Sequence, residues 1–292
     1  MLLGLVGVCG AAAVAVYISL VVRGPSRAAL ISKAGAGLTF VLAGAVAAYT
    51  ATLRGAGSTS LATHALCFAL LILSGLVCGV LGDIWLDLNA LVPTAAQAFA
   101  PGTSAKVHDA APSPFPNAPA QEDDSAASSG VAPPQGGPPE NAPPAFMMAG
   151  FASFALGHIF YTTALIWYWR PPWEATAAAL ALAGLFAMAV VLAGRRRLGL
   201  DFGQLTVPAG VYGFILASMA IVAWTCCITT AGVGALPMGA GGTMFLISDL
   251  VLCFQLFRPG KAKPSGTAVC LVFYYAAQFA IALSPLALCS AS

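Results

Sequence analysis

Long apolar runs, separated by shorter stretches that carry most of the charges, fill most of the 292-residue chain. About eight of these runs approach the ~20 residues that a helix needs to cross a bilayer. Because lipid offers no partners to backbone N–H and C=O groups, and the alternation typical of barrel strands is absent, each run is predicted to be helical. The pattern predicts an all-α, polytopic membrane bundle with helices near residues 2–22, 30–52, 63–88, 146–169, 173–193, 205–226, 239–257 and 265–286.

Composition points to the same class of protein. Charged residues make up only 8% of the chain and hydrophobic residues 59%, which excludes an ordinary soluble domain. The first apolar run has no basic residue ahead of it and no clear small-residue cleavage site before Arg23. We therefore expect it to be a retained helix and not a signal sequence.

The placement of basic residues predicts the orientation. They cluster in the connections after the first, fifth and seventh runs, whereas the opposite connections hold only Arg54 and Arg170. Since Lys and Arg stay on the cytoplasmic side, both termini are predicted to be non-cytoplasmic. The clustered residues are Arg23, Arg27, Lys33, Arg195, Arg196, Arg197, Arg258, Lys261 and Lys263.

One soluble-looking stretch divides the chain. Residues 91–145 are rich in Pro, Ala, Gly and Ser, hold five of the ten acidic residues and show no apolar periodicity. We expect a disordered cytoplasmic loop, whose role stays open. The predicted organisation is transmembrane helices 1–3 in residues 1–90, this loop, and helices 4–8 in residues 146–292, with the two outer parts forming one membrane domain.

Two acidic residues and one histidine lie well inside predicted spans. Asp83 and Asp249 fall in the third and seventh helices, and His158 interrupts the fourth. An ionisable group at bilayer depth costs roughly 2.5 to 3.5 kcal/mol on insertion scales, so it normally faces a cavity or a partner and marks function. The alternative is that each only forms structural hydrogen bonds between helices.

Helical spacing places further polar side chains near these three. Gly75, Gly79 and Asp83 recur every fourth residue, so a neighbouring helix can approach closely on that face. Polar residues also share stripes on the fourth and last helices. Those residues are His158, Tyr161 and Thr162 on the fourth helix, and Tyr274, Tyr275 and Gln278 on the last.

Short similar words surround Asp83 and Asp249, and four helices separate them. A duplicated four-helix unit is one interpretation, and it would place the two aspartates across an axis along the membrane normal. With the orientation above, both aspartates lie in the cytoplasmic half of the membrane. We therefore hypothesise a single pocket that opens to the cytoplasmic leaflet.

Other chemistries fit poorly. The eight cysteines lack CxxC spacing, and no HExxH, GxSxG or phosphate-binding glycine loop is present. We expect no cofactor, no nucleic-acid partner and no metal, the alternative being a metal bound by Asp83, Asp249 and His158. The rival functions are a proton-coupled transporter of small molecules or lipids, whose acids would relay protons, and a nonenzymatic lipid-binding protein.

Five sequence blocks, in order, resemble the YhhN-type lysoplasmalogenases. The resemblance covers most of the chain from the second helix onward, excluding 91–145. This chain departs from the family in having Ala34 where Pro often follows the lysine, and in its long connection between the third and fourth helices. The blocks are GLVCGVLGDIWL (75–86), FALGHIFYTTAL (154–165), VPAGVYGFILASM (207–219), TMFLISDLVL (243–252) and FYYAAQFAIALS (273–284).

The resemblance implies about eight helices and hydrolysis of the vinyl ether bond of lysoplasmalogens. The products would be a fatty aldehyde and glycerophosphoethanolamine or glycerophosphocholine. A vinyl ether resists hydroxide and breaks by protonation at carbon, which gives an oxocarbenium ion that water captures, so the reaction needs an acid. A second carboxylate could stabilise the cation and activate water, as paired carboxylates do in glycosidases.

We therefore predict Asp83 and Asp249 as the catalytic pair, without assigning which is the acid, and His158 as a residue that orients water or tunes one of them. The predicted partners are a lysophospholipid substrate and the lipid bilayer. Head-group preference, chain length and oligomeric state stay open. The predicted substrate-binding residues are Tyr161, Tyr274, Tyr275 and Gln278, with Lys33 and Arg258 as candidates for the phosphate.

Overall fold

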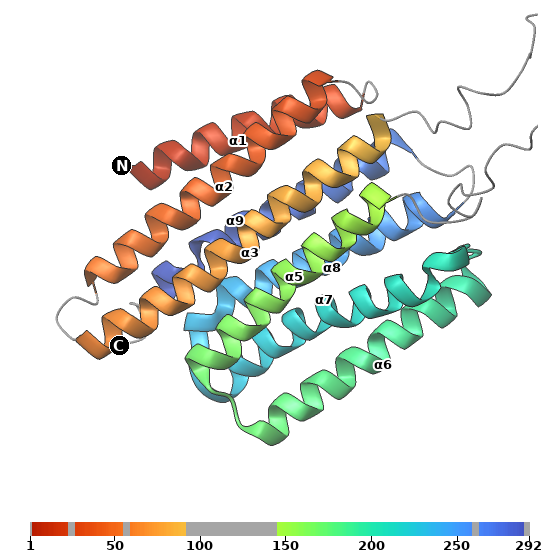
Figure 1. The fold of residues 1–292 in the computed structure, drawn as a ribbon. Coiled ribbons are helices and arrows are strands. Elements are labelled where there is room, and N and C mark those ends of the chain that lie inside the picture. The colour runs from red at the N-terminus through yellow and green to blue at the C-terminus, as the bar shows by residue number, and fades with distance from the viewer. Residues whose placement is uncertain (1, 23–26, 55–58, 92–144, 259–262, 289–292) are drawn as a thin grey trace, which may run out of the picture. The chain divides into compact units, whose positions relative to one another are not determined.

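The computed structural model describes residues 2–22, 27–54, 59–91, 145–258 and 263–288. Within these ranges it has eight long helices and no strand, which confirms the predicted all-α membrane bundle (Figure 1). All eight are long and apolar enough to span a bilayer. They are α1 (Leu2–Val21), α2 (Arg27–Arg54), α3 (Thr59–Leu91), α5 (Ala145–Trp169), α6 (Trp173–Arg197), α7 (Thr206–Cys226), α8 (Leu236–Phe257) and α9 (Pro264–Ala287).

The connections follow from their glycine and proline residues. Pro171 and Pro172 separate α5 from α6, and the short helix η1 (Gly203–Leu205) precedes α7. The chain leaves α7 through a π-helical turn, η2 (Cys227–Ala231), and reverses at Gly232, whose φ of 51° favours glycine. The 3₁₀ turn η3 (Gly232–Ala235) then leads into α8, which begins three residues before the predicted residue 239. Pro237 fits there because the first turn of a helix needs no backbone donor.

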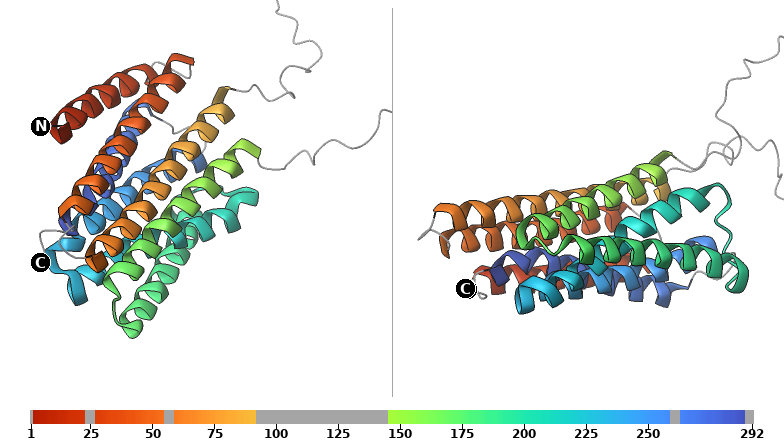
Figure 2. Two further views of the ribbon diagram at one scale, coloured as in Figure 1. Left: turned by 60° about the vertical axis from the view of Figure 1, so that its left-hand side comes forward. Right: turned by 90° about the horizontal axis from the view of Figure 1, so that it is seen from below.

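Most helices that follow each other in the chain pack side by side, but α5 packs against α3 and α7 in place of α6, and α9 closes the bundle by packing against both α8 and α2. The first turn of α1 and the last turn of α9 lie at the same end (Figure 1). The green helix α6 lies at the edge of the bundle and packs mainly against α7 (Figures 1 and 2). The helices belong to the unit formed by residues 1–91 and 143–292. The predicted disordered loop, except for its end residues 91 and 145, lies outside the described residues.

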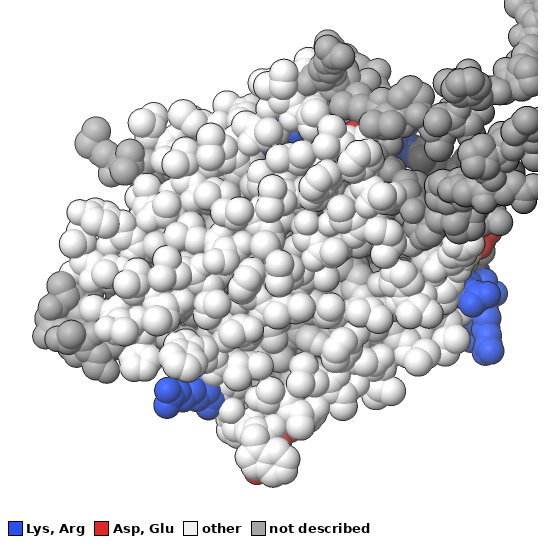
Figure 3. All heavy atoms as spheres, in the orientation of Figure 1, with Lys and Arg blue, Asp and Glu red and all other residues white. Residues whose placement is uncertain are grey.

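The lateral surface is suited to lipid. On the face drawn in Figure 3, Lys and Arg lie near the ends of the bundle, and the broad surface between them carries almost no charge. Large apolar side chains such as Leu70, Leu185 and Val272 are exposed on the helices. Their exposure is expected where acyl chains, and not water, surround the protein. The direction of the bundle in the membrane stays a prediction.

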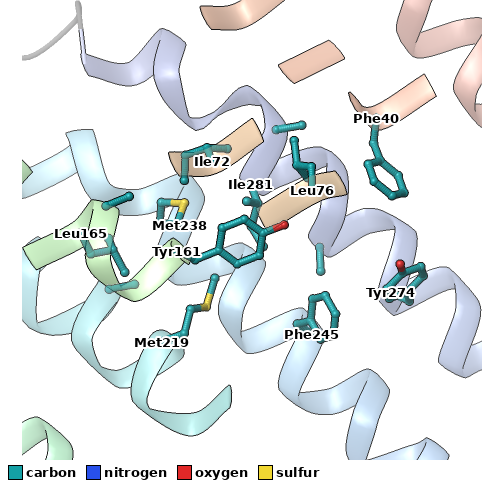
Figure 4. Close-up of a cluster of buried hydrophobic side chains, with 14 of the residues drawn as sticks. Phe40, Ile72, Leu76, Tyr161, Leu165, Met219, Met238, Phe245, Tyr274 and Ile281 are labelled. Carbon is teal, nitrogen blue, oxygen red and sulfur yellow. The ribbon is translucent and has the colours of Figure 1, made fainter. Parts of the chain in front are cut away.

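The core is built from aromatic and aliphatic side chains that meet between the helices (Figure 4). Tyr161 of α5 lies in the middle of this view and is 1% exposed. The glycine stripe predicted on α3 faces this core: Gly75 faces the Tyr161 ring, and Gly79 faces the Gln278 amide of α9. Gly157 of α5 in turn lies against the backbone of Gly75. The close approach of α3 and α5 therefore depends on small residues from both helices.

Replacing Gly75 by alanine is expected to destabilise the protein by about 1–3 kcal/mol, because the new methyl would collide with the buried Tyr161 ring. Thermal unfolding in detergent measures the effect. Gly35→Ala on α2 is the matched control, since a methyl there meets no atom within 4 Å. The control should leave stability unchanged or raise it by up to ~1 kcal/mol. Equal melting temperatures for the two variants would contradict the packing described here.

Candidate active site

A buried charge cluster joins α2 to α3 toward the end of the bundle where α3 ends. The Lys33 Nζ atom lies 3.2 Å from the Asp83 Oδ1 atom and 2.8 Å from the Asp87 Oδ1 atom. Lys33 and Asp83 are 7% and 6% exposed, and Asp87 is only partly buried. The Lys33 ammonium also lies 5.7 Å from the centre of the Tyr17 ring of α1. Lys33 therefore pairs with two carboxylates, and its predicted role as a phosphate ligand stays a prediction.

A chain of hydrogen bonds leads from Asp83 into the core. The Tyr274 hydroxyl donates to the Asp83 Oδ2 atom at 2.6 Å, and the Gln278 Nε2 atom donates to the Tyr274 hydroxyl at 3.1 Å. The Tyr161 hydroxyl donates to the Gln278 Oε1 atom at 3.3 Å. Together with Lys33 these residues form what we term the Asp83 network, and it unites five residues that the sequence proposed for the site.

Asp249 belongs to a second cluster. The Tyr212 hydroxyl of α7 donates a short hydrogen bond to the Asp249 Oδ2 atom of α8. The same hydroxyl lies 3.5 Å from the His158 Nε2 atom of α5. The other ring nitrogen of His158, Nδ1, is buried without a hydrogen-bond partner among the described residues. We term Asp249, Tyr212 and His158 the Asp249 network.

Tyr212 was not among the candidates proposed from the sequence. It lies in the block VPAGVYGFILASM, but no other polar residue shares its face of α7 at helical spacing. Its ring is held by stacking on Phe151, with ring centres 5.7 Å apart and an angle of 16° between the planes. Only the packing of α5, α7 and α8 brings its hydroxyl to Asp249.

Aromatic rings lie between the two networks. The Phe245 ring centre is 4.5 Å from that of His158 and 5.3 Å from that of Tyr274, and Figure 4 shows Phe245 beside Tyr274. No hydrogen bond or ion pair among the described residues joins the Asp83 network to the Asp249 network. The aspartates therefore occupy neighbouring networks, and the pairing predicted from the sequence stays a prediction.

Asp249 and Tyr212 line an apolar pocket of about 80 Å³ between α6, α7 and α8. Among the described residues of its wall, only these two carry a carboxyl or hydroxyl group; the rest are Cys253 and aliphatic and aromatic residues such as Leu216, Leu246 and Phe202. Asp83 does not line it. Of the two aspartates that the sequence predicted to share one pocket, this cavity therefore contains only Asp249.

Two other predicted residues join neither network through a hydrogen bond of the described chain, although the Tyr275 ring centre lies 5.0 Å from that of Tyr274. The Tyr275 hydroxyl is buried without a hydrogen-bond partner among the described residues, and its ring lies 6.1 Å from that of Tyr17. Arg258 is exposed at the end of α8, where it lines a surface hollow with Lys263. The described residues contain no group of three His, Cys, Asp or Glu side chains that could hold a metal ion.

The sequence model of the YhhN family matches residues 141–285, a range that includes α5 to α8 and reaches the last turn of α9. The chain belongs to the YhhN family. This confirms the family predicted from the five blocks. The whole Asp249 network lies in the matched part of this YhhN protein, whereas Lys33 and Asp83 come from helices that precede it. No curated protein and no solved structure matches the chain.

We expect Lys33→Met to destabilise the protein by about 3–5 kcal/mol, because it leaves the buried Asp83 carboxylate without its cation. Unfolding in detergent checks this. The double variant Lys33→Met with Asp83→Asn removes both charges and should recover part of the loss. Lys263→Met, which changes an exposed lysine, is the control and should stay within about 0.5 kcal/mol of the parent. A Lys33 variant as stable as this control would contradict the ion pair.

Proposed function

We propose that this YhhN protein hydrolyses the vinyl ether bond of lysoplasmalogens, giving a fatty aldehyde and a glycerophospho-alcohol. The observation that carries the proposal is the apolar pocket whose two polar wall residues, Asp249 and Tyr212, share a hydrogen bond. An acid in an apolar cavity within a membrane bundle suits a reaction that begins with protonation of a hydrocarbon double bond. Family membership supports the same class of reaction.

The surroundings of the two aspartates suggest a division of roles. Asp83 faces the Lys33 ammonium and serves as a carboxylate. Asp249 has no ion-pair partner among the described residues, and an uncompensated carboxylate in an apolar setting is costly. In the proposed mechanism Asp249 is therefore the proton donor, and the negative charge of Asp83, in the network on the other side of Phe245, stabilises the cation that forms.

The reaction then proceeds in three steps. Asp249 gives its proton to the double-bond carbon that is remote from the ether oxygen, and the other carbon and the oxygen share the positive charge. Water adds to that charged carbon and returns a proton to Asp249, which leaves a neutral hemiacetal. The hemiacetal loses its hydroxyl proton and breaks the bond to the glycerol oxygen, which takes up a proton. The products are the aldehyde and the alcohol, and the enzyme is regenerated.

Tyr212 and His158 complete the proposed site. The Tyr212 hydroxyl fixes one oxygen of Asp249, so the other oxygen can face the substrate. His158 approaches the same hydroxyl and is placed to orient the attacking water or to hold Tyr212. The Asp83 network would support the glycerol side through its hydroxyl and amide groups.

Asp249→Asn is expected to lower aldehyde release by about 10²–10⁴-fold, because the amide cannot donate the proton as the acid does. Asp83→Asn should lower it less, since it removes only a stabilising charge. The assay is aldehyde formation from a lysoplasmalogen in detergent, with folding of each variant checked by thermal unfolding. Glu174→Gln, at an exposed carboxylate of α6, is the control and should keep parental turnover.

Near-parental turnover of folded Asp249→Asn would overturn the proposed acid. A parent protein that releases no aldehyde but takes up a solute in response to a proton gradient would instead favour the transporter. Saturable lipid binding without either activity would favour a lipid-binding protein. Each candidate function thus predicts a different outcome in the same set of measurements.

Tyr212→Phe is expected to lower kcat by about 10-fold, because the ring keeps its stacking on Phe151 while Asp249 loses its hydrogen bond. KM should change little, since the pocket keeps its apolar wall. Tyr49→Phe removes a hydroxyl from an exposed tyrosine of α2 and serves as the control. A KM increase with unchanged kcat would show that Tyr212 binds substrate instead of positioning the acid.

A further inference from the structure

The position of α6 leaves one side of the candidate pocket weakly closed. This helix packs mainly against α7, whereas α7 and α8 each pack against several helices. The pocket that contains Asp249 lies between these three helices. On the side toward the membrane, the pocket is therefore closed by side chains between α6 and α8, which are not a closely packed pair of helices.

A second cavity lies at this boundary. It measures about 260 Å³ and is lined by apolar residues of α6, of α8 and of the turn after α6. Four side chains line both cavities and so form the partition between them: Phe186, Val190, Leu250 and Cys253. None of the described residues that line the second cavity is charged. The two cavities form one apolar path from the lipid-facing side of the bundle to Asp249, interrupted only by the partition.

We propose that the two cavities are the binding site of a single long hydrocarbon chain, which enters from the bilayer between α6 and α8 past this partition. The proposal rests on the proposed function for the identity of the bond that is cleaved. It adds where the chain of the substrate lies and how it arrives. For the chain to pass, the four partition side chains must move aside.

The lining argues for hydrocarbon as the occupant. A glycerophosphate group would have to leave water and would find no basic partner along a path without Lys or Arg. An alkenyl chain instead exchanges one apolar environment for another. The first pocket follows α8 from Leu246 to Phe257, which at 1.5 Å per residue is roughly 16 Å of helix. Such a length suits one extended chain running past Asp249.

A pair of glycines on α7 provides a matched test. Gly213 lines the pocket that contains Asp249, whereas Gly210 lines a separate hollow on the outer side of α6 and α7. A methyl group at either position would make only ordinary contacts, at 3.9 Å with Ala187 and at 3.8 Å with Val191. Both alanine variants should therefore fold, but only the methyl at Gly213 takes space from the proposed chain.

Gly213→Ala is expected to lower the ratio of kcat/KM for long-chain over short-chain lysoplasmalogens by about 10-fold, the effect of one methylene in a tight apolar pocket. Gly210→Ala should change that ratio by less than about twofold. If both variants keep the parental ratio while the parent releases aldehyde, the chain lies elsewhere and the inference is wrong. If the parent releases no aldehyde from any chain, the proposed function fails first.

A binding experiment tests the path without turnover. The probe is a saturated alkyl ether lysophosphatidylethanolamine with a diazirine on its chain; it has no double bond to protonate. After illumination in membranes, labelling is expected on Phe186, Val190 and Leu250, and an excess of the same lipid without the diazirine should remove it. An excess of a two-chain phosphatidylethanolamine should leave this labelling unchanged. Labelling that no lipid displaces, or that the two-chain lipid displaces equally well, would overturn the single-chain site.

Discussion

The pairing of buried charge inside a bundle that lipid surrounds is the constraint on which the rest of this structure depends. Lys33 and Asp83 are both almost fully buried, and neither could remain ionised there alone. Their contact ties α2 to α3, and the bond from Tyr274 to Asp83 ties α3 to α9. The charge cluster therefore fixes the relative positions of three helices, whereas apolar packing alone would tolerate many arrangements.

The helices could be predicted because hydrophobic length is a local property. Eight runs near the thickness of a bilayer became eight helices, and the glycine stripe on α3 became a contact surface. Gln278, Tyr274 and Asp83 were also found from the sequence, because polar groups on apolar helices are rare and their spacing shows which face they share. Each of these predictions could be made from the sequence of a single helix.

What the sequence could not predict depends on more than one helix. Tyr212 is a single tyrosine on α7 without a polar neighbour on its face, so nothing local connects it to Asp249. The position of Phe245 between His158 and Tyr274 likewise results from packing between helices, since phenylalanine in an apolar run carries no special signal. Lys33 showed its charge in the sequence, but its two carboxylate partners lie 50 and 54 residues further along the chain.

The three hydrogen bonds that lead from Tyr161 through Gln278 and Tyr274 to Asp83 all have the same donor-to-acceptor direction. Tyr161 donates to Gln278, Gln278 donates to Tyr274, and Tyr274 donates to the carboxylate. Each bond polarises the next, so the row increases the partial positive charge on the Tyr274 hydroxyl hydrogen that faces Asp83. The link through Gln278 is an amide, which holds its protons firmly at neutral pH, unlike the hydroxyl groups on either side. The row therefore stabilises the Asp83 anion from a distance, while its amide link relays protons far less readily than a row made of hydroxyl groups alone.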